Sequence, residues 1–190
     1  MGFLDTLLGR TKPVPPKLDA LFALPSAAIT LQAATDFVPT GTGSVCFRAA
    51  EGRAFSDIEK DVKELLAMGD ATAPVRVSSD SYGFTWLVCT HDAADVEGLV
   101  TDLHAVNSSL EAGGFGPQLL CTLLSFRDSA GKPLGLVYLY KRGTFYPFAP
   151  RPGERRDNAT ELRIRGALGD DLKVEPELDR WFPVWGAPGL

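Results

Sequence analysis

The chain has 190 residues, of which 45% are hydrophobic and 23% are charged, and its formal net charge is -5. This length fits a single domain that buries a sizeable core, and the composition is that of an ordinary globular protein. A nucleic-acid-binding protein normally carries a strong basic excess. The negative net charge therefore argues against that class, and we expect no nucleic-acid partner.

No apolar run reaches the roughly 20 residues that a membrane-spanning helix needs. The opening stretch, MGFLDTLLGR, does not fit a secretory signal, because Asp5 interrupts a short apolar run and basic residues follow it. We therefore expect a cytoplasmic protein, with any membrane contact weak or indirect at the inner face of the membrane.

The N-terminal segment permits three interpretations. Met1, Gly2 and Thr6 match the myristoylation pattern, but a single acyl chain anchors a protein only marginally and nothing else indicates a eukaryotic host. As a helix, the segment has one apolar face. That face consists of Phe3, Leu4, Leu7 and Leu8. Because two turns are too short to be stable alone, we expect the face to dock on the protein itself or on a partner; contact with a bilayer is the less favoured alternative.

Residues 11–17, TKPVPPK, form a proline-rich linker between this helix and a single domain over residues 18–190. Residues 18–24 predict a short helix that ends before Pro25. Two short apolar runs, residues 27–34 and 44–50, predict strands, and the glycine-rich residues 37–43 predict the turn between them.

Two further units follow the same helix–strand–strand order. The second predicts a helix over residues 55–68 and then two strands, and the third a longer helix and then two more strands. The two strands of the second unit are predicted at residues 74–79 and 82–91. The third unit has its helix at residues 92–113 and its strands at 117–128 and 133–143. The order favours an α+β fold in which helices cover an antiparallel sheet.

A last amphipathic helix is expected from about Asn158 to Leu172. The tail from residue 179 to 190, DRWFPVWGAPGL, is too apolar to lie free in water, so we expect it to dock on the domain through Trp181, Phe182 and Trp185.

Cys89 and His91 are the strongest candidates for catalysis. At this spacing on a strand both side chains lie on one face, and Asp92 or Asp95 could orient the imidazole. A small cysteine-dependent hydrolase or thiol enzyme is therefore one alternative. Cys46, Cys89 and Cys121 all lie in apolar runs, which instead predict buried, reduced thiols. The spacing of cysteine and histidine predicts no metal site, and we expect no cofactor.

The stretch from residue 141 to 151 combines cations and aromatic residues in a proline-rich sequence. Such side chains on a rigid loop are typical of protein-interaction hot spots. The alternative is a loop whose aromatic rings cover the sheet while its charges face water. The candidate contact residues are Lys141, Arg142, Phe145, Tyr146, Phe148 and Arg151.

Several long strings of residues, including MGFLDTLLGR, VYLYKRGTFYPFAP and RWFPVWGAPGL, make the chain resemble the actinobacterial PspA-associated protein family PspAB. The resemblance covers nearly the whole length and is interrupted mainly at residues 51–76. It implies a cytoplasmic accessory of the phage-shock, envelope-stress system, with a PspA-type coiled-coil protein as partner and an HtpX-type membrane protease as a second one. The family supplies no catalytic residues.

The helix–strand–strand order is also loosely similar to YbjN and type III secretion chaperone folds, which bind protein segments. We therefore expect a non-enzymatic adaptor that acts by protein–protein interaction. Its contact surfaces would be the apolar N-terminal face, the 141–151 stretch and the aromatic tail. The alternatives are the thiol enzyme and a peripheral membrane protein that binds through its N-terminal helix.

Overall fold

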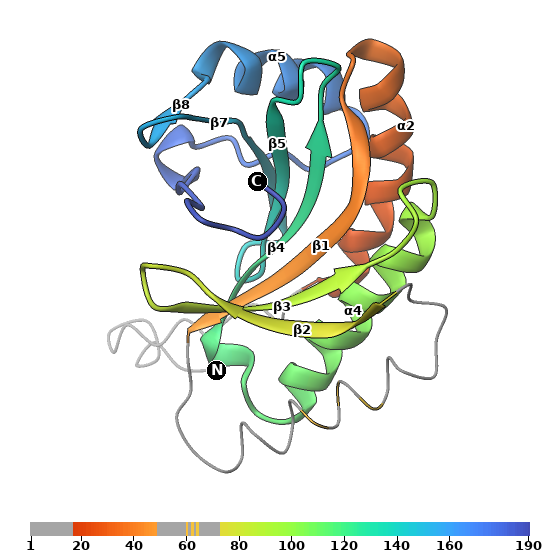
Figure 1. The fold of residues 1–190 in the computed structure, drawn as a ribbon, viewed down its shortest axis with the longest axis vertical. Helices are drawn as coiled ribbons and strands as arrows, with labels where there is room; N and C mark the ends of the chain where they lie inside the picture. The colour runs from red at the N-terminus through yellow and green to blue at the C-terminus, as the bar shows by residue number, and fades with distance from the viewer. Residues whose placement is uncertain (1–16, 49–59, 61, 63, 65–72) are drawn as a thin grey trace, which may run out of the picture.

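The computed structural model describes residues 17–48, 60, 62, 64 and 73–190. Its centre is an antiparallel six-stranded sheet in the order β2-β3-β1-β4-β5-β6 (Figure 1). The strands are β1 Val38–Arg48, β2 Ala73–Ser79, β3 Phe84–Thr90, β4 Leu119–Arg127, β5 Pro133–Leu139 and β6 Thr144–Phe148. Helices pack against this sheet, which confirms the predicted α+β class.

The helical elements occur before, between and after the strands. They are η1 Leu18–Ala23, α2 Leu24–Ala34, α4 Val96–Ala112, η2 Gly116–Gln118, α5 Asn158–Leu168 and η3 Leu178–Arg180. A two-stranded ribbon of β7 Pro150–Arg151 and β8 Arg155–Arg156 precedes α5. No helix in the described part of the chain is long and apolar enough to cross a bilayer.

The strand predicted at residues 27–34 is wrong, because these residues belong to α2. Pro25 stands in the first turn of this helix, where the missing amide hydrogen costs nothing. It therefore begins a helix rather than ending one. Ala27, Ala28 and Leu31 are buried on one side of α2 while Ile29 is 69% exposed, which is the one-sided burial of a surface helix.

The turn predicted at residues 37–43 is also wrong, because β1 runs through it. The register between β1 and β4 shifts between Pro39 and Gly43, as at a β-bulge. Gly41 has a φ of +75°, and a Cβ there would lie 2.3 Å from the carbonyl oxygen of His91. The glycines thus mark an irregular strand packed closely against its neighbours, and the first unit contributes one strand instead of two.

The loop predicted around residues 144–148 is wrong as well, since these residues form β6. This strand is at the edge of the sheet, and an edge strand tolerates Pro147 because only one of its sides carries the ladder of hydrogen bonds. The second helix, predicted at residues 55–68, lies mostly outside the described residues, although Lys60, Val62 and Glu64 are helical.

The sheet is apolar on both faces, so it separates two cores. One core lies between the sheet and helices η1, α2, α4 and α5, and contains Phe47, Leu87 and Phe126. The other lies on the opposite face beneath the C-terminal tail, and contains Trp86 and Trp181. Adjacent residues in the strands alternate between the two cores, as the period of a strand requires.

The tail (blue in Figure 1) lies across the second face of the sheet. The indole of Trp181 stacks on Tyr146 at 6.0 Å between ring centroids and donates its Nε1 hydrogen to the carbonyl of Glu175 at 3.0 Å. Tyr146 in turn donates its hydroxyl hydrogen to the carbonyl of Phe182 at 2.7 Å. These contacts fix the tail on the sheet, while the side chain of Phe182 is 59% exposed.

Two tail residues should therefore differ sharply in their effect on stability. Trp181→Ala removes a ring that is 4% exposed and should lower the free energy of unfolding by about 3 kcal/mol. Phe182→Ala should change it by less than about 0.5 kcal/mol. Urea unfolding of both variants measures this difference, and equal losses would mean that the tail is not packed as described.

Candidate functional site

The Cys89 thiol lies in the core between the sheet and the helices and is 1% exposed. Burial, with a smaller contribution from the charge of Asp102, raises its pKa to about 12. A catalytic thiol needs the opposite environment, an accessible one that favours the thiolate. The geometry therefore gives no support to an enzyme that uses Cys89.

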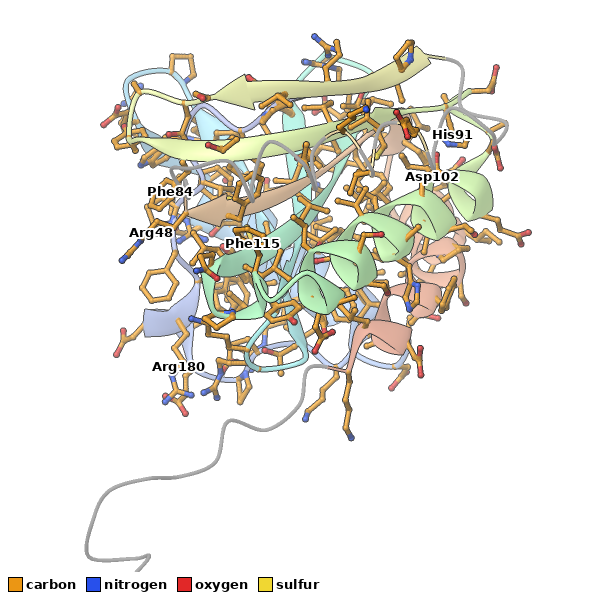
Figure 2. The ribbon with its side chains drawn as sticks, turned by 90° about the horizontal axis from the view of Figure 1, so that it is seen from below. Arg48, Phe84, His91, Asp102, Phe115 and Arg180 are labelled. Atoms are coloured by element: carbon orange, nitrogen blue, oxygen red, sulfur yellow. The ribbon has the colours of Figure 1, made fainter. Side chains whose placement is uncertain are left out.

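His91 is instead held between the carboxylates of Asp95 and Asp102, and Figure 2 shows it beside Asp102. Its Nδ1 lies 2.7 Å from Asp95 and its Nε2 lies 2.8 Å from Asp102. Burial alone would lower the pKa of His91, but the hydrogen bonds to Asp102 and Asp95 outweigh it and raise the pKa. With both nitrogens donating, the imidazolium joins the end of β3 to α4, which Asp95 caps by accepting a hydrogen bond from the Gly98 amide at 2.9 Å. This arrangement is a structural clamp.

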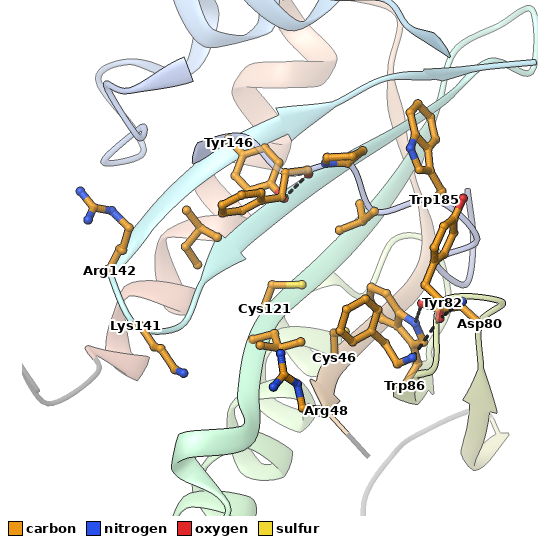
Figure 3. Close-up of a pocket in the computed structure, with 16 residues that line it drawn as sticks. Cys46, Arg48, Asp80, Tyr82, Trp86, Cys121, Lys141, Arg142, Tyr146 and Trp185 are labelled. Atoms are coloured by element: carbon orange, nitrogen blue, oxygen red, sulfur yellow. Dashed lines mark hydrogen bonds between the residues drawn. The ribbon is translucent and has the colours of Figure 1, made fainter. Parts of the chain in front are cut away.

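An apolar pocket of about 520 Å³ opens on the face of the sheet that the tail covers only in part (Figure 3). Its volume falls within the roughly 300–1,000 Å³ of ordinary ligand sites. The pocket is lined by residues of five strands, of the turns beside them and of the tail. These are Cys46, Arg48, Asp80, Tyr82, Phe84, Trp86, Leu120, Cys121, Leu139, Lys141, Arg142, Tyr146, Phe182, Pro183, Val184 and Trp185.

The turn between β2 and β3 forms one wall of the pocket. Asp80 accepts hydrogen bonds from the amides of Tyr82 and Phe84 at 2.9 and 3.0 Å and from the indole of Trp86 at 2.9 Å. One carboxylate thus satisfies three donors, which holds the turn and its aromatic residues rigid. The Tyr82 hydroxyl also donates to Glu154 at 2.5 Å.

Two thiols form part of the pocket floor. Cys46 and Cys121 face each other across β1 and β4, and both are buried and reduced, as predicted. Their mutual hydrogen bond, together with burial, raises the pKa of Cys46. A protonated thiol behaves as a small apolar side chain, so the floor is apolar in character.

Three cations line the pocket (Figure 3). Lys141 and Arg142 lie on the side away from Tyr82 and Trp185, and Arg48 lies between the two sides. Arg142 donates from Nε to Glu175 at 2.7 Å, and Glu175 is fully buried. Burial would raise the pKa of Glu175, but its hydrogen bonds to Arg142 and Thr144 lower it. Arg48 and Lys141 contact no carboxylate among the residues that the structure describes.

The structure brings together some of the candidate contact residues and separates others. The predicted residues that line the pocket are Lys141, Arg142, Tyr146, Phe182 and Trp185. Trp181, within the tail, is buried against the sheet, and Phe148 packs edge-on against Trp185 at 4.8 Å. Phe145 faces the helix-side core, and Arg151 pairs with Asp157 at a different hollow.

Phe145, Tyr146, Phe148 and Trp181 are each at most 4% exposed. Phe148 and Trp181 therefore support the pocket face from beneath, Tyr146 forms part of the pocket wall, and Phe145 belongs to the other core. The N-terminal residues Phe3, Leu4, Leu7 and Leu8 lie outside the described residues.

Most of the pocket residues carry no individual signal in the sequence. Cys46, Trp86 and Cys121 are pocket residues because they alternate with core residues of the other face. A signal that could have revealed the pocket face is a strand that is apolar at every position. Such a strand has an apolar side chain on both faces of the sheet. Within the described residues no group of three or more acidic, histidine or cysteine side chains is placed to hold a metal ion.

The clamp at His91 makes the stability depend on pH. A raised folded-state pKa contributes stability that is complete below the ordinary value of 6.5 and is lost as the pH rises through the folded-state pKa. The difference in unfolding free energy between wild type and His91→Gln should therefore shrink as the pH rises above 6.5. His104→Gln, which removes the other histidine, is the control. A difference for His91→Gln that stays constant with pH would contradict the charged clamp.

Comparison with known proteins gives one family. No curated protein and no solved structure matches the chain significantly. Residues 1–189 match the family described as PspA associated protein B. Because this match covers almost the whole length, the chain belongs to the PspAB family.

Proposed function

We propose that this protein is a non-enzymatic accessory of the PspA system that binds a protein partner across the mouth of the apolar pocket. The family links the chain to PspA, and the burial of Cys89 argues against the thiol enzyme that the sequence offered as an alternative. The observation that carries the proposal is an exposed aromatic side chain, Phe182, beside an open apolar pocket.

The rim has the make-up of an interaction hot spot. Trp185 is held by its edge-on contact with Phe148 at 4.8 Å between ring centroids. The guanidinium of Arg156 in turn lies over the Phe148 ring, 5.2 Å from its centroid. Held in this way, the aromatic groups lose little further entropy on binding, so their buried area is converted efficiently into affinity. Tyr82, which is 49% exposed, adds a third aromatic side chain at the opposite wall.

The charge of the rim indicates what the partner offers. Lys141 and Arg48 add positive potential to a molecule whose net charge is -5. A partner with acidic residues beside an apolar stripe complements this surface, and such charges increase the association rate and the specificity. Coiled coils in general carry charged residues beside an apolar seam, and a PspA-type coiled-coil protein is the first partner that we propose. An HtpX-type membrane protease is the second.

The N-terminal face of Phe3, Leu4, Leu7 and Leu8 is a second contact surface in this proposal. The argument for this surface comes from the sequence alone. A helix of this length is stable only when its apolar face is docked. The first surface therefore provides the sharper test.

The decisive variants change the rim and leave the core intact. Phe182→Ala and Lys141→Glu should each weaken binding of purified PspA by about tenfold or more, since a hot-spot side chain contributes about 2 kcal/mol. Isothermal titration calorimetry measures the affinity. The effect of Lys141→Glu should diminish at high salt, because screening removes charge attraction at the surface.

Matched controls lie on other surfaces. Ile29→Ala truncates an apolar residue that is 69% exposed on α2, and Lys132→Glu reverses an exposed charge in the turn between β4 and β5. Both should bind PspA like the wild type. Unchanged affinity of Phe182→Ala and Lys141→Glu, with the fold intact, would exclude the rim as the contact surface.

A further inference from the structure

The interior of the pocket presents apolar surface and almost no polar atom that still needs a partner. The Trp86 indole is bonded to Asp80, the Tyr146 hydroxyl to the Phe182 carbonyl, and the Cys46 thiol to Cys121. Among the described residues, none of the buried side-chain atoms that lack a hydrogen bond belongs to a lining residue. A polar occupant would lose its hydrogen bonds to water without replacement. The buried part of any ligand must therefore be apolar.

One side of the pocket nevertheless attracts an anion. Arg142 is neutralised by Glu175, whereas Arg48 and Lys141 have no carboxylate partner among the described residues. Lys141 lies on the side of the pocket away from Asp80, and Arg48 lies between them (Figure 3). These two cations give an elongated ligand one orientation, with its anionic group beside Arg48 and Lys141 and away from Asp80.

The lining of the pocket indicates what kind of molecule suits it. An extended protein segment would bring unpaired amide and carbonyl groups to side chains that offer them no free partner. An alkyl chain carries no polar group, and its transfer from water into an apolar interior is favourable.

We propose that the pocket binds a single-chain amphiphile, with the alkyl chain in the apolar interior and a carboxylate or phosphate head group at Arg48 and Lys141. This inference goes beyond the proposed function and does not depend on it, because the ligand binds to the protein alone. A lipid-derived carboxylate and a lipid-derived phosphate share this chemistry, so the two head groups are compared directly.

Tryptophan fluorescence gives a local readout, since Trp86 and Trp185 line the pocket. Bromine-labelled laurate, added to the full chain below its micelle concentration, should quench this fluorescence with a saturable, one-to-one dependence. Laurate and dodecyl phosphate should compete with it, and their relative affinities identify the preferred head group. Dodecyltrimethylammonium, with the same chain and the opposite charge, should bind at least about tenfold more weakly.

Variants locate the site. Val184→Trp and Leu139→Trp each place a bulky indole ring in the lining and should abolish the laurate binding measured by calorimetry. Ile29→Trp on α2 should leave laurate binding unchanged. Val184 is in the tail, so its variant keeps the test valid if a change within β5 disturbs folding. Arg48→Glu with Lys141→Glu should weaken laurate about tenfold or more, and Lys132→Glu should have no effect.

Three results would overturn the proposal. The first is the absence of saturable laurate and dodecyl phosphate binding, which includes the case in which a protein segment alone occupies the site. The second is equal affinity for the cationic amphiphile, and the third is quenching that persists in Val184→Trp. None of these measurements involves PspA, so failure here leaves the proposed adaptor function to its own test.

Discussion

Every feature of this protein depends on a sheet that is apolar on both faces. Such a sheet must be covered twice, because each exposed face would present apolar surface to water. The helices cover most of one face, and Leu87, Leu99 and Phe126 there are fully buried. Among the described residues, the C-terminal tail is what covers the opposite face, and it spans part of the six strands (Figure 1). The pocket is the part of this face that the described chain leaves open.

The tail is held by polar contacts as much as by its rings. Glu175 lies just before the tail and is fully buried. It accepts hydrogen bonds from Arg142 and Thr144 at 2.7 Å each. Arg156 donates both to the buried Glu161 and to the carbonyl of Trp181. A buried carboxylate without its partner costs several kcal/mol, so these pairs allow one position of the tail. Because Arg142 also lines the pocket, the same pair that anchors the tail fixes one edge of the site.

How far the sequence predicts this fold depends on whether local pattern or tertiary packing decides each element. Helix α4 was predicted because its apolar residues recur at helical spacing, and the structure adds the cap at Asp95. Residues 27–34 and 144–148 were assigned wrongly, because Pro25 was taken to end a helix and the proline-rich stretch was taken as a loop. Pro25 instead opens α2, and Pro147 is tolerated at the edge of the sheet. Neither context is visible before the neighbouring elements are known.

The site was less predictable than the fold for a related reason. Lys141 and Trp185 were recognised by type, as exposed charge and large aromatic, but nothing local indicates that Cys46, Trp86 and Cys121 share a cavity. A pocket of this kind is defined by what the tail does not cover, and that depends on where Glu175 and Trp181 anchor it. Since the anchor residues are buried and the rim residues are exposed, changes at the rim can alter binding while the fold is retained. The sheet thus provides a rigid base on which the specificity of the open face can vary independently of stability.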